Sequence, residues 1–382
     1  MDALFQGFIN LSWQAIVMYA IGGLLIFLAV KKDYEPMLLL PIGFGAILVN
    51  LPFSAVWSYD GHDGVLQFFY NVGILTEIFP LLIFVAVGAM IDFSPLLKNP
   101  KMLFLGAAAQ FGIFATILAA VAIGEAFPAL GIDLKSAASI GIIGAADGPT
   151  SIFVAAKFAP QFLGPISVAA YSYMALVPII QPPVIKALTT KKERMMRMEY
   201  TEKKISRTTL ILFPIIVTVI AGIIAPVCVP LVGMLMFGNL IRECGVLERL
   251  SQSAQNELAN LVTLLLGITI GSTMRHEQFL QPMTLFIMIL GFVAFVFDTA
   301  GGVLFVKFLN LFSKEQYKIN PMVGAAGISA FPMAARIVQK MATKEDPHNF
   351  ILMQAVSANV AGQIASAIAG GMVLAIVPEL LK

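Results

Sequence analysis

Long runs of apolar residues recur along the whole chain, and few charged residues interrupt them. Two such runs are WQAIVMYAIGGLLIFLAV (13–30) and TLILFPIIVTVIAGIIAPVCVPLVGMLMF (209–237). A helix needs about 20 mainly apolar residues to cross the hydrocarbon core of a bilayer. The pattern therefore predicts an all-α polytopic membrane protein.

Polar and helix-breaking residues divide the runs into about ten transmembrane helices. Two further apolar segments, 136–158 and 319–339, are predicted to be broken re-entrant hairpins, the first interrupted at Gly148-Pro149. Irregular backbone at membrane depth is tolerated where it lines a cavity or is buried in protein. The ten helices are expected at 13–30, 36–53, 73–91, 102–124, 162–185, 208–225, 226–241, 259–273, 281–303 and 350–377.

Composition and charge agree with this class and orient the chain. Hydrophobic residues make up 59% of the sequence and charged residues 12%, whereas a soluble domain has about 25% charged residues. Basic residues cluster between Lys186 and Arg207. An excess of Lys and Arg marks cytoplasmic loops, so this loop is placed inside; a site for anionic lipid or a partner is the alternative. The first hairpin must then be entered from outside and the second from inside.

The two halves of the chain also resemble each other. A shift of 183 residues aligns Gly88 with Gly271, Gly141 with Gly324, Gly144 with Gly327 and Pro149 with Pro332, and GFG (43–45) echoes MFG (236–238). Inverted repeats with interrupted helices are typical of transporters whose site lies at the membrane midplane. We therefore expect an N-terminal helix (1–35), a first repeat (36–185), a basic loop with a linking helix (186–225) and a second repeat (226–382).

Asp147 is the leading candidate for chemistry, because a carboxylate at membrane depth is costly and marks a functional site by default. Thr150 and Ser151 add hydroxyl oxygens, and the break frees backbone carbonyls. Hard cations such as Na⁺ prefer oxygen ligands, so the segment suits Na⁺ and its exchange for H⁺. Capping of a half-helix by Asp147 is a compatible alternative.

The second hairpin and two neighbouring helices supply further polar candidates, each with a structural alternative. Asn320 is a ligand or a turn residue before Pro321, and Ser329 is a ligand or a packing residue. Arg336 docks an anionic substrate or snorkels to the surface. Tyr173 and Asn359 are expected to face the hairpins, although Asn359 also fits a helix-packing face.

Other polar residues are assigned structural roles. Glu77, Asp92 and Asp298 are expected near span ends, as anchors or caps. The three histidines and two cysteines show no metal-ligand or disulfide pattern. No phosphate loop or nucleotide fingerprint occurs, so ATP bound to this chain is not the expected energy source, and nothing indicates a nucleic-acid partner.

Three motifs together resemble the β subunit of the biotin-dependent sodium-pumping decarboxylases, which act on oxaloacetate, methylmalonyl-CoA, glutaconyl-CoA or malonate. They are GAADGPTSIFVAAKFAP, NPMVGAAGISAFPMAAR and SANVAGQIASA. The resemblance covers almost the whole chain. It implies decarboxylation of carboxybiotin coupled to Na⁺ export, with consumption of a proton.

The resemblance also implies roles and partners. Na⁺ ligands would be Asp147, Asn320, Ser329 and Asn359; catalytic residues would be Asp147, Tyr173, Ser329 and Arg336; carboxybiotin would lie near Arg336 and Gly324. Expected partners are an α carboxyltransferase subunit, a biotin carrier protein, a small γ/δ membrane subunit and membrane lipids, in an oligomeric assembly of the bacterial cytoplasmic (inner) membrane. The alternatives are a stand-alone Na⁺/H⁺ antiporter, a Na⁺-coupled carboxylate transporter or a structural scaffold.

Overall fold

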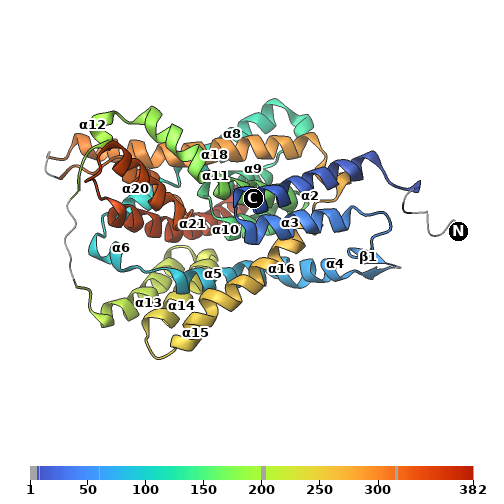
Figure 1. Cartoon of the computed structure of the whole chain (residues 1–382), viewed down its shortest axis with the longest axis horizontal. Helices are drawn as coiled ribbons and strands as arrows, with labels where there is room; N and C mark the ends of the chain where they lie inside the picture. The colour runs from blue at the N-terminus through green and yellow to red at the C-terminus, as the bar shows by residue number, and fades with distance from the viewer. Residues whose placement is uncertain (1–6, 8, 60, 199–203, 315–316, 382) are drawn as a thin grey trace.

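The fold is all-α, as the hydrophobic pattern predicts. The computed structural model describes residues 7, 9–59, 61–198, 204–314 and 317–381 (Figure 1). Within them the strands are β1 (Ser58–Tyr59) and β2 (His62–Asp63), which pair antiparallel in a small hairpin. The remaining regular structure is helical.

The helices of the first half lead from the N-terminal region to the basic segment. Two short irregular turns among them matter below: the π turn η1 (Tyr70–Ile74) and the 3₁₀ turn η3 (Ile142–Ala145). The α-helices are α2 (Trp13–Lys32), α3 (Pro36–Val49), α4 (Val65–Phe69), α5 (Ile78–Met90), α6 (Ser94–Lys98), α7 (Met102–Ala108), α8 (Phe111–Ala126), α9 (Leu134–Gly141), α10 (Gly148–Phe158) and α11 (Leu163–Leu188).

The second half repeats this mixture of long and broken helices. It includes a second π turn, η6 (Ala254–Leu258). The α-helices are α12 (Lys191–Arg194), α13 (Arg207–Ile224), α14 (Val229–Glu243), α15 (Glu248–Ser253), α16 (Ala259–Ser272), α17 (His276–Phe279), α18 (Pro282–Leu311), α19 (Met322–Ala325), α20 (Met333–Glu345) and α21 (Leu352–Leu380).

Seven helical segments of the described chain are long and apolar enough to cross a membrane, and an eighth arises if the pair 65–74 and 78–90, bent by 61°, is one span. This confirms a polytopic membrane protein. Helix α3 has 14 residues, fewer than a bilayer crossing requires. The expected number of about ten spans therefore stays a prediction.

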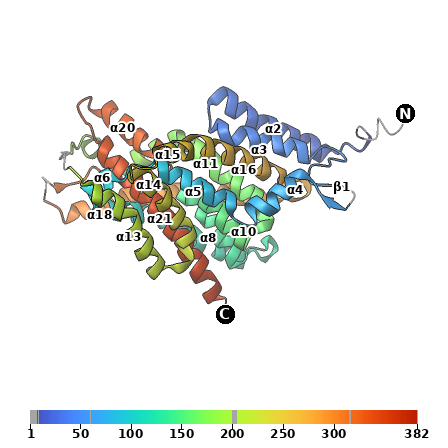
Figure 2. The ribbon, with the colours of Figure 1, turned by 90° about the horizontal axis from the view of Figure 1, so that it is seen from below.

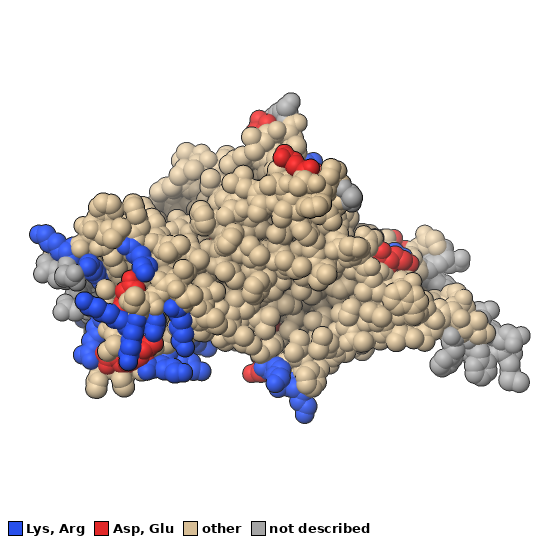
Figure 3. Space-filling model, turned by 90° about the horizontal axis from the view of Figure 1, so that it is seen from above, with Lys and Arg blue, Asp and Glu red and all other residues tan. Residues whose placement is uncertain are grey.

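The long helices run mostly along the longest axis of the molecule (Figures 1 and 2). Lys and Arg side chains gather at the end that carries α12 and α20 (Figure 3), and β1 lies at the opposite end. This is the distribution that the positive-inside rule predicts for a cytoplasmic end. Of the basic stretch 186–207, positions 199–203, with Lys203 among them, lie outside the described residues.

The first predicted hairpin is broken, but two residues earlier than expected. Helix α9 continues into η3, Ala146 takes a left-handed conformation (φ 52°), and Asp147 is the N-cap of α10. Gly148-Pro149 therefore begins a helix and does not interrupt one. The physical reason is that proline fits the first helical turn, where its missing N–H is not needed, and aspartate is a favoured N-cap.

The second predicted hairpin is also irregular. The short helix α19 is followed by turns over 326–332 before α20 begins. Helix α20 continues to Glu345, beyond the expected end of the hairpin at position 339. That both segments are re-entrant stays a prediction.

Candidate functional site

The two broken segments meet inside the molecule. The backbone N–H of Ser329 donates to the carbonyl of Ala145 at 3.0 Å. A helix break leaves backbone groups without an intrahelical partner, and a buried polar group without a partner is costly. Each break thus supplies a partner to the other, and Asp147 lies two residues beyond the junction.

The Asp147 carboxylate is buried and surrounded by hydroxyl and amide donors. Its Oδ2 accepts hydrogen bonds from the Thr150 hydroxyl (2.8 Å) and the Ser366 hydroxyl (2.7 Å), and its Oδ1 accepts from the Thr150 N–H (3.2 Å). Within the described residues no basic side chain pairs with Asp147. A single carboxylate among neutral oxygens is a donor set that suits a monovalent hard cation.

Helix α21 connects Asp147 with the second broken segment. The side chains of Asn359, Gln363 and Ser366 follow one another at i, i+4 and i+7, so they share a helix face. The Asn359 amide donates to the carbonyl of Ile328 at 2.6 Å, and the Gln363 amide donates to the carbonyl of Ser329. Since Ser366 bonds Asp147, one helix face contacts both breaks.

The structure therefore brings three predicted residues into one network: Asp147, Ser329 and Asn359. The Ser329 hydroxyl adds a further link, because it donates to the carbonyl of Gly362 on α21 at 2.9 Å. All three side chains are at least 95% buried. This junction of α9, α10, α21 and the turns after α19 is the candidate ion site.

Asn320 lies at a different place. Its amide nitrogen donates to the carbonyls of Arg194 (3.1 Å) and Met196 (2.9 Å), and its amide oxygen accepts from the N–H of Met322. The side chain thus ties the start of the second broken segment to the end of α12 and the residues that follow it. In this conformation its polar atoms are used there, away from Asp147.

Tyr173 and Gly324 both pack against α18. The Tyr173 hydroxyl donates to the carbonyl of Met288. A Cβ added to Gly324 would lie 2.0 Å from the carbonyl oxygen of Gly302, so only glycine permits this approach of α19 to α18. No hydrogen bond joins Tyr173 to Asp147 in the part of the chain that the structure describes.

Arg336 is exposed and lines a cavity of about 450 Å³ between α11 and α20. Lys186, Lys340 and Lys344 line the same cavity. It lies at the basic end of the molecule (Figure 3). Clustered positive charge raises the local concentration of anions, so the cavity suits an anionic ligand.

Ion pairs hold the end of α12 and the residues that follow it against the end of α20. Arg194 bonds Glu345 and Arg197 bonds Asp346, each at 2.7 Å. The hydrogen bond from Arg194 holds the pKa of Glu345 below its usual range, and that from Arg197 does the same for the pKa of Asp346. The segment that binds Asn320 is thereby fastened to the helix that carries Arg336.

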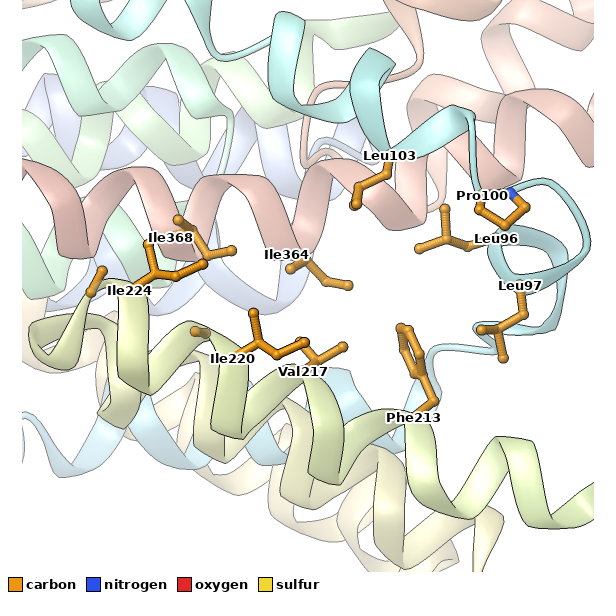
Figure 4. A pocket seen from close by; sticks show the side chains of 12 residues that line it. Leu96, Leu97, Pro100, Leu103, Phe213, Val217, Ile220, Ile224, Ile364 and Ile368 are labelled. Carbon is orange, nitrogen blue, oxygen red and sulfur yellow. The ribbon is translucent and has the colours of Figure 1, made fainter.

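A smaller cavity, of about 280 Å³, lies between α13, the α6–α7 connection and α21 (Figure 4). Leu103, Phe213 and Ile364 are among the side chains that point into it, and all of its lining residues are apolar. It offers no group that would bind an ion or orient a carboxylate. The candidate site is therefore not this cavity.

Ser366 and Gln363 were not predicted from the sequence. A signal for Ser366 was present, since it lies two helical turns after Asn359 on the same face. The Tyr171 ring fills the space beside Gly148, where an added Cβ would lie 2.2 Å from it. Glycine after Asp147 is thus needed for the approach of α10 to α11.

Comparison with known proteins identifies the family. Residues 14–377 match the family described as Na⁺-transporting oxaloacetate decarboxylase beta subunit. The chain belongs to this family. It is 49% identical to methylmalonyl-CoA decarboxylase subunit beta of Propionigenium modestum (97% of this chain, 96% of the relative). It is 45% identical to the oxaloacetate decarboxylase beta chain of Klebsiella pneumoniae (98% of each) and 48% identical to glutaconyl-CoA decarboxylase subunit beta of Acidaminococcus fermentans (97% and 96%).

The family predicted from the three motifs is thereby confirmed. These β subunits and the long apolar helices support a multi-pass protein of the bacterial cytoplasmic membrane. The stand-alone transporter is not favoured. The roles assigned to single residues stay predictions.

Proposed function

We propose that this chain decarboxylates carboxybiotin presented by a partner subunit and uses the free energy to export Na⁺. The bond between the biotin ring nitrogen and the carboxyl carbon breaks, CO₂ leaves, and a proton replaces it on the nitrogen. The observation that carries the ion-transport part is the buried junction at which Ser366 and Ser329 link Asp147 to the second broken segment. Membership of the family supports the decarboxylase part.

The proposed Na⁺ site is this junction, with Asp147 as the charged ligand and Ser329 and Asn359 as neutral contributors. Its support is chemical, because the side chains there are a carboxylate, hydroxyls and amides, the hard oxygen donors that Na⁺ prefers. Asn320 is proposed to act indirectly. It would hold the second broken segment to the segment after α12 through the carbonyls of Arg194 and Met196.

The proposed carboxybiotin site is the basic cavity beside Arg336. A guanidinium can bind a carboxylate with two parallel hydrogen bonds, and Lys186 and Lys340 add positive charge. Tyr173 and Gly324 would shape the approach from α11 and α19 through their packing on α18. The cavity is lined by residues of α20, at the basic end of the molecule, where a soluble partner would have access.

The proposed partners follow from the family. The β subunits belong to multi-subunit decarboxylases, so we propose an α carboxyltransferase subunit, a biotin carrier protein and a small γ/δ membrane subunit. The basic end is the proposed docking face for the carrier, since clustered charge steers association. An oligomeric assembly is part of this proposal.

We also propose that the chain consists of two inverted repeats. The support is a contact that occurs twice with exchanged roles. A Cβ on Gly45 would lie 2.4 Å from the carbonyl oxygen of Ile268, and one on Gly238 would lie 2.0 Å from that of Val85. Gly45 corresponds to Gly238 in the GFG and MFG motifs, and Val85 corresponds to Ile268 in the 183-residue shift. The contact of α3 with α16 is therefore equivalent to the contact of α14 with α5.

Two further correspondences extend the proposed repeats. The π turns η1 and η6 precede α5 and α16. Helices α2 and α13 precede α3 and α14, and their N-caps are Ser12 and Ser206, whose hydroxyls accept the N–H groups of Ala15 and Thr209. We propose that the repeats begin with α2 and α13, ahead of the expected starts at positions 36 and 226.

Inversion of the repeats can be tested with two single cysteines at equivalent connections. Ser58 lies between α3 and α4, and Val246, 80% exposed, lies between α14 and α15. In a variant without Cys228 and Cys244, S58C is expected to react with a membrane-impermeant maleimide in intact cells. V246C is expected to react only in inside-out vesicles. Labelling of both from the same side would contradict inversion.

The proposed activity can be tested in inside-out vesicles that carry the whole complex. Addition of the carboxylated substrate is expected to drive uptake of radioactive Na⁺, and avidin is expected to prevent it. The reason is that avidin sequesters biotin, which would carry the carboxyl group to this chain. Uptake and CO₂ release are measured in the same sample.

The control is a Na⁺ ionophore, which should abolish accumulation of Na⁺ while CO₂ release continues. Uptake that ignores avidin and follows an imposed pH gradient would instead identify an antiporter. That outcome would overturn the proposed decarboxylase function.

A further inference from the structure

Asp298 is a second acid buried at membrane depth, and the proposed mechanism does not use it. The expectation that it lies near a span end, as an interfacial anchor, is wrong, although its carboxylate does accept an N–H in the first turn of α8. It sits in the interior of α18, which continues to Leu311, and its side chain is fully buried. The expected helix ended at position 303, and its greater length places Asp298 well inside.

The Asp298 carboxylate fills a break in a neighbouring span. The expected helix 102–124 is interrupted between α7 and α8, and Asp298 Oδ1 accepts the N–H of Ile113 in the first turn of α8 at 3.1 Å. A Cβ on Gly112 would lie 2.5 Å from Oδ1, and one on Gly144 would lie 2.6 Å from Oδ2. Two glycines thus make room for this carboxylate.

Within the described residues, the second oxygen of this carboxylate has no partner. Among the described residues, no hydrogen bond reaches Asp298 Oδ2, and no basic side chain pairs with it. Leaving a buried charge uncompensated costs several kcal/mol. Three more buried oxygens without a partner lie on α18, on α8 and just before α8: those of Thr299, Thr116 and Gln110.

The missing partner is best explained by a monovalent cation. An unsatisfied buried polar atom in a native protein calls for an explanation such as an ion or a water. The oxygens here are one carboxylate, two hydroxyls and one amide, which are hard ligands. No group of three His, Cys, Asp or Glu residues in the described chain would hold a metal ion, and a single negative charge matches a single positive one.

We propose that Asp298 Oδ2 anchors a second Na⁺ site at the break between α7 and α8, completed by oxygens of Thr299, Thr116 and Gln110. The proposal rests on the proposed Na⁺ transport. The site touches both broken segments, because Gly144 precedes Asp147 by three residues and the Gln110 amide donates to the carbonyl of Gly327 at 3.5 Å. Movement of either segment would therefore change both Na⁺ sites together.

The test is the thermal unfolding of the purified full chain in Na⁺, with K⁺ at equal ionic strength as the matched control. A ligand that binds only the folded state raises Tm with its concentration. We expect D147N and D298N each to retain part of the Na⁺-specific rise, and the double variant to lose it. A D298N chain with the full wild-type rise would overturn the proposal, as would a D147N chain that loses the whole rise.

A second variant covers the case in which D298N does not fold. T299V keeps the carboxylate of Asp298. In the D147N chain it is expected to raise the Na⁺ concentration that gives half of the Tm rise about 10-fold, in the range for loss of a supporting group. An unchanged concentration would contradict the site. A Tm that changes with pH but not with Na⁺ would make Asp298 a proton site and refute the proposal. Because the readout needs no carboxybiotin, absence of any Na⁺-specific rise in the wild type would instead refute the proposed Na⁺ transport.

Discussion

Replacement of Asp147 by asparagine is expected to abolish Na⁺-stimulated decarboxylation while the chain stays folded in the membrane. The variant keeps the shape of the side chain but removes the one negative charge of the junction. Loss of a supporting group alone costs roughly 10–100-fold in metal affinity, so loss of the charged ligand should exceed about 100-fold. The measurement is CO₂ release by the whole complex as a function of Na⁺ concentration.

Ser366→Ala is the graded control for this prediction. It removes one of the hydroxyl groups that donate to Asp147 Oδ2 and leaves the charge in place. Its half-saturating Na⁺ concentration should rise about 10-fold, at the lower end of the range for supporting groups. Full retention of Na⁺ coupling in D147N would show that Asp147 is not a ligand of the transported ion.

Arg336→Ala is expected to weaken the use of carboxybiotin without changing the Na⁺ dependence. A hydrogen bond to a charged group contributes about 1.5–3 kcal/mol, which corresponds to roughly 10–100-fold in KM for the carboxylated carrier. The expectation follows from the place of Arg336, which is exposed in the basic cavity and away from Asp147. Initial rates at several carrier concentrations, each at two Na⁺ concentrations, provide the measurement.

Two variants of the same cavity serve as controls. Arg336→Lys keeps the charge but loses the planar guanidinium that can donate two hydrogen bonds to a carboxylate. Its KM should therefore lie between that of the wild type and that of R336A. Lys340→Ala removes a neighbouring charge from the same helix and should have a smaller effect, because an exposed charge contributes little. Equal effects of R336A and K340A would indicate general attraction of the carrier in place of a specific contact.

The second broken segment connects the two proposed sites. Its start is held by Asn320 to the segment after α12, which Arg194 fastens to the end of α20. Its turns reach the Asp147 junction through Ser329. Binding at the basic end can therefore reach the ion site through one continuous piece of backbone. This arrangement gives a physical basis for the proposed coupling of decarboxylation to Na⁺ movement.

The class of the protein and the candidate acid could be predicted from the sequence alone, because both depend on local properties. Hydropathy over about 20 residues measures the cost of leaving water, and this predicts membrane helices wherever they lie in the fold. The cost of a carboxylate at membrane depth singles out Asp147 in the same way. The glycine and proline matches likewise indicated two related halves.

Which residues surround Asp147 was decided by the tertiary structure. Ser366 lies 219 positions further along the chain, and Ser329 meets Ala145 across the two halves. No local pattern encodes such pairings, since they arise from how α21 packs against both breaks. The depth of Asp298 in the fold was misjudged for the same reason. Sequence patterns indicate how readily each segment leaves water and which side chains share a helix face, whereas only the packed fold determines which faces meet.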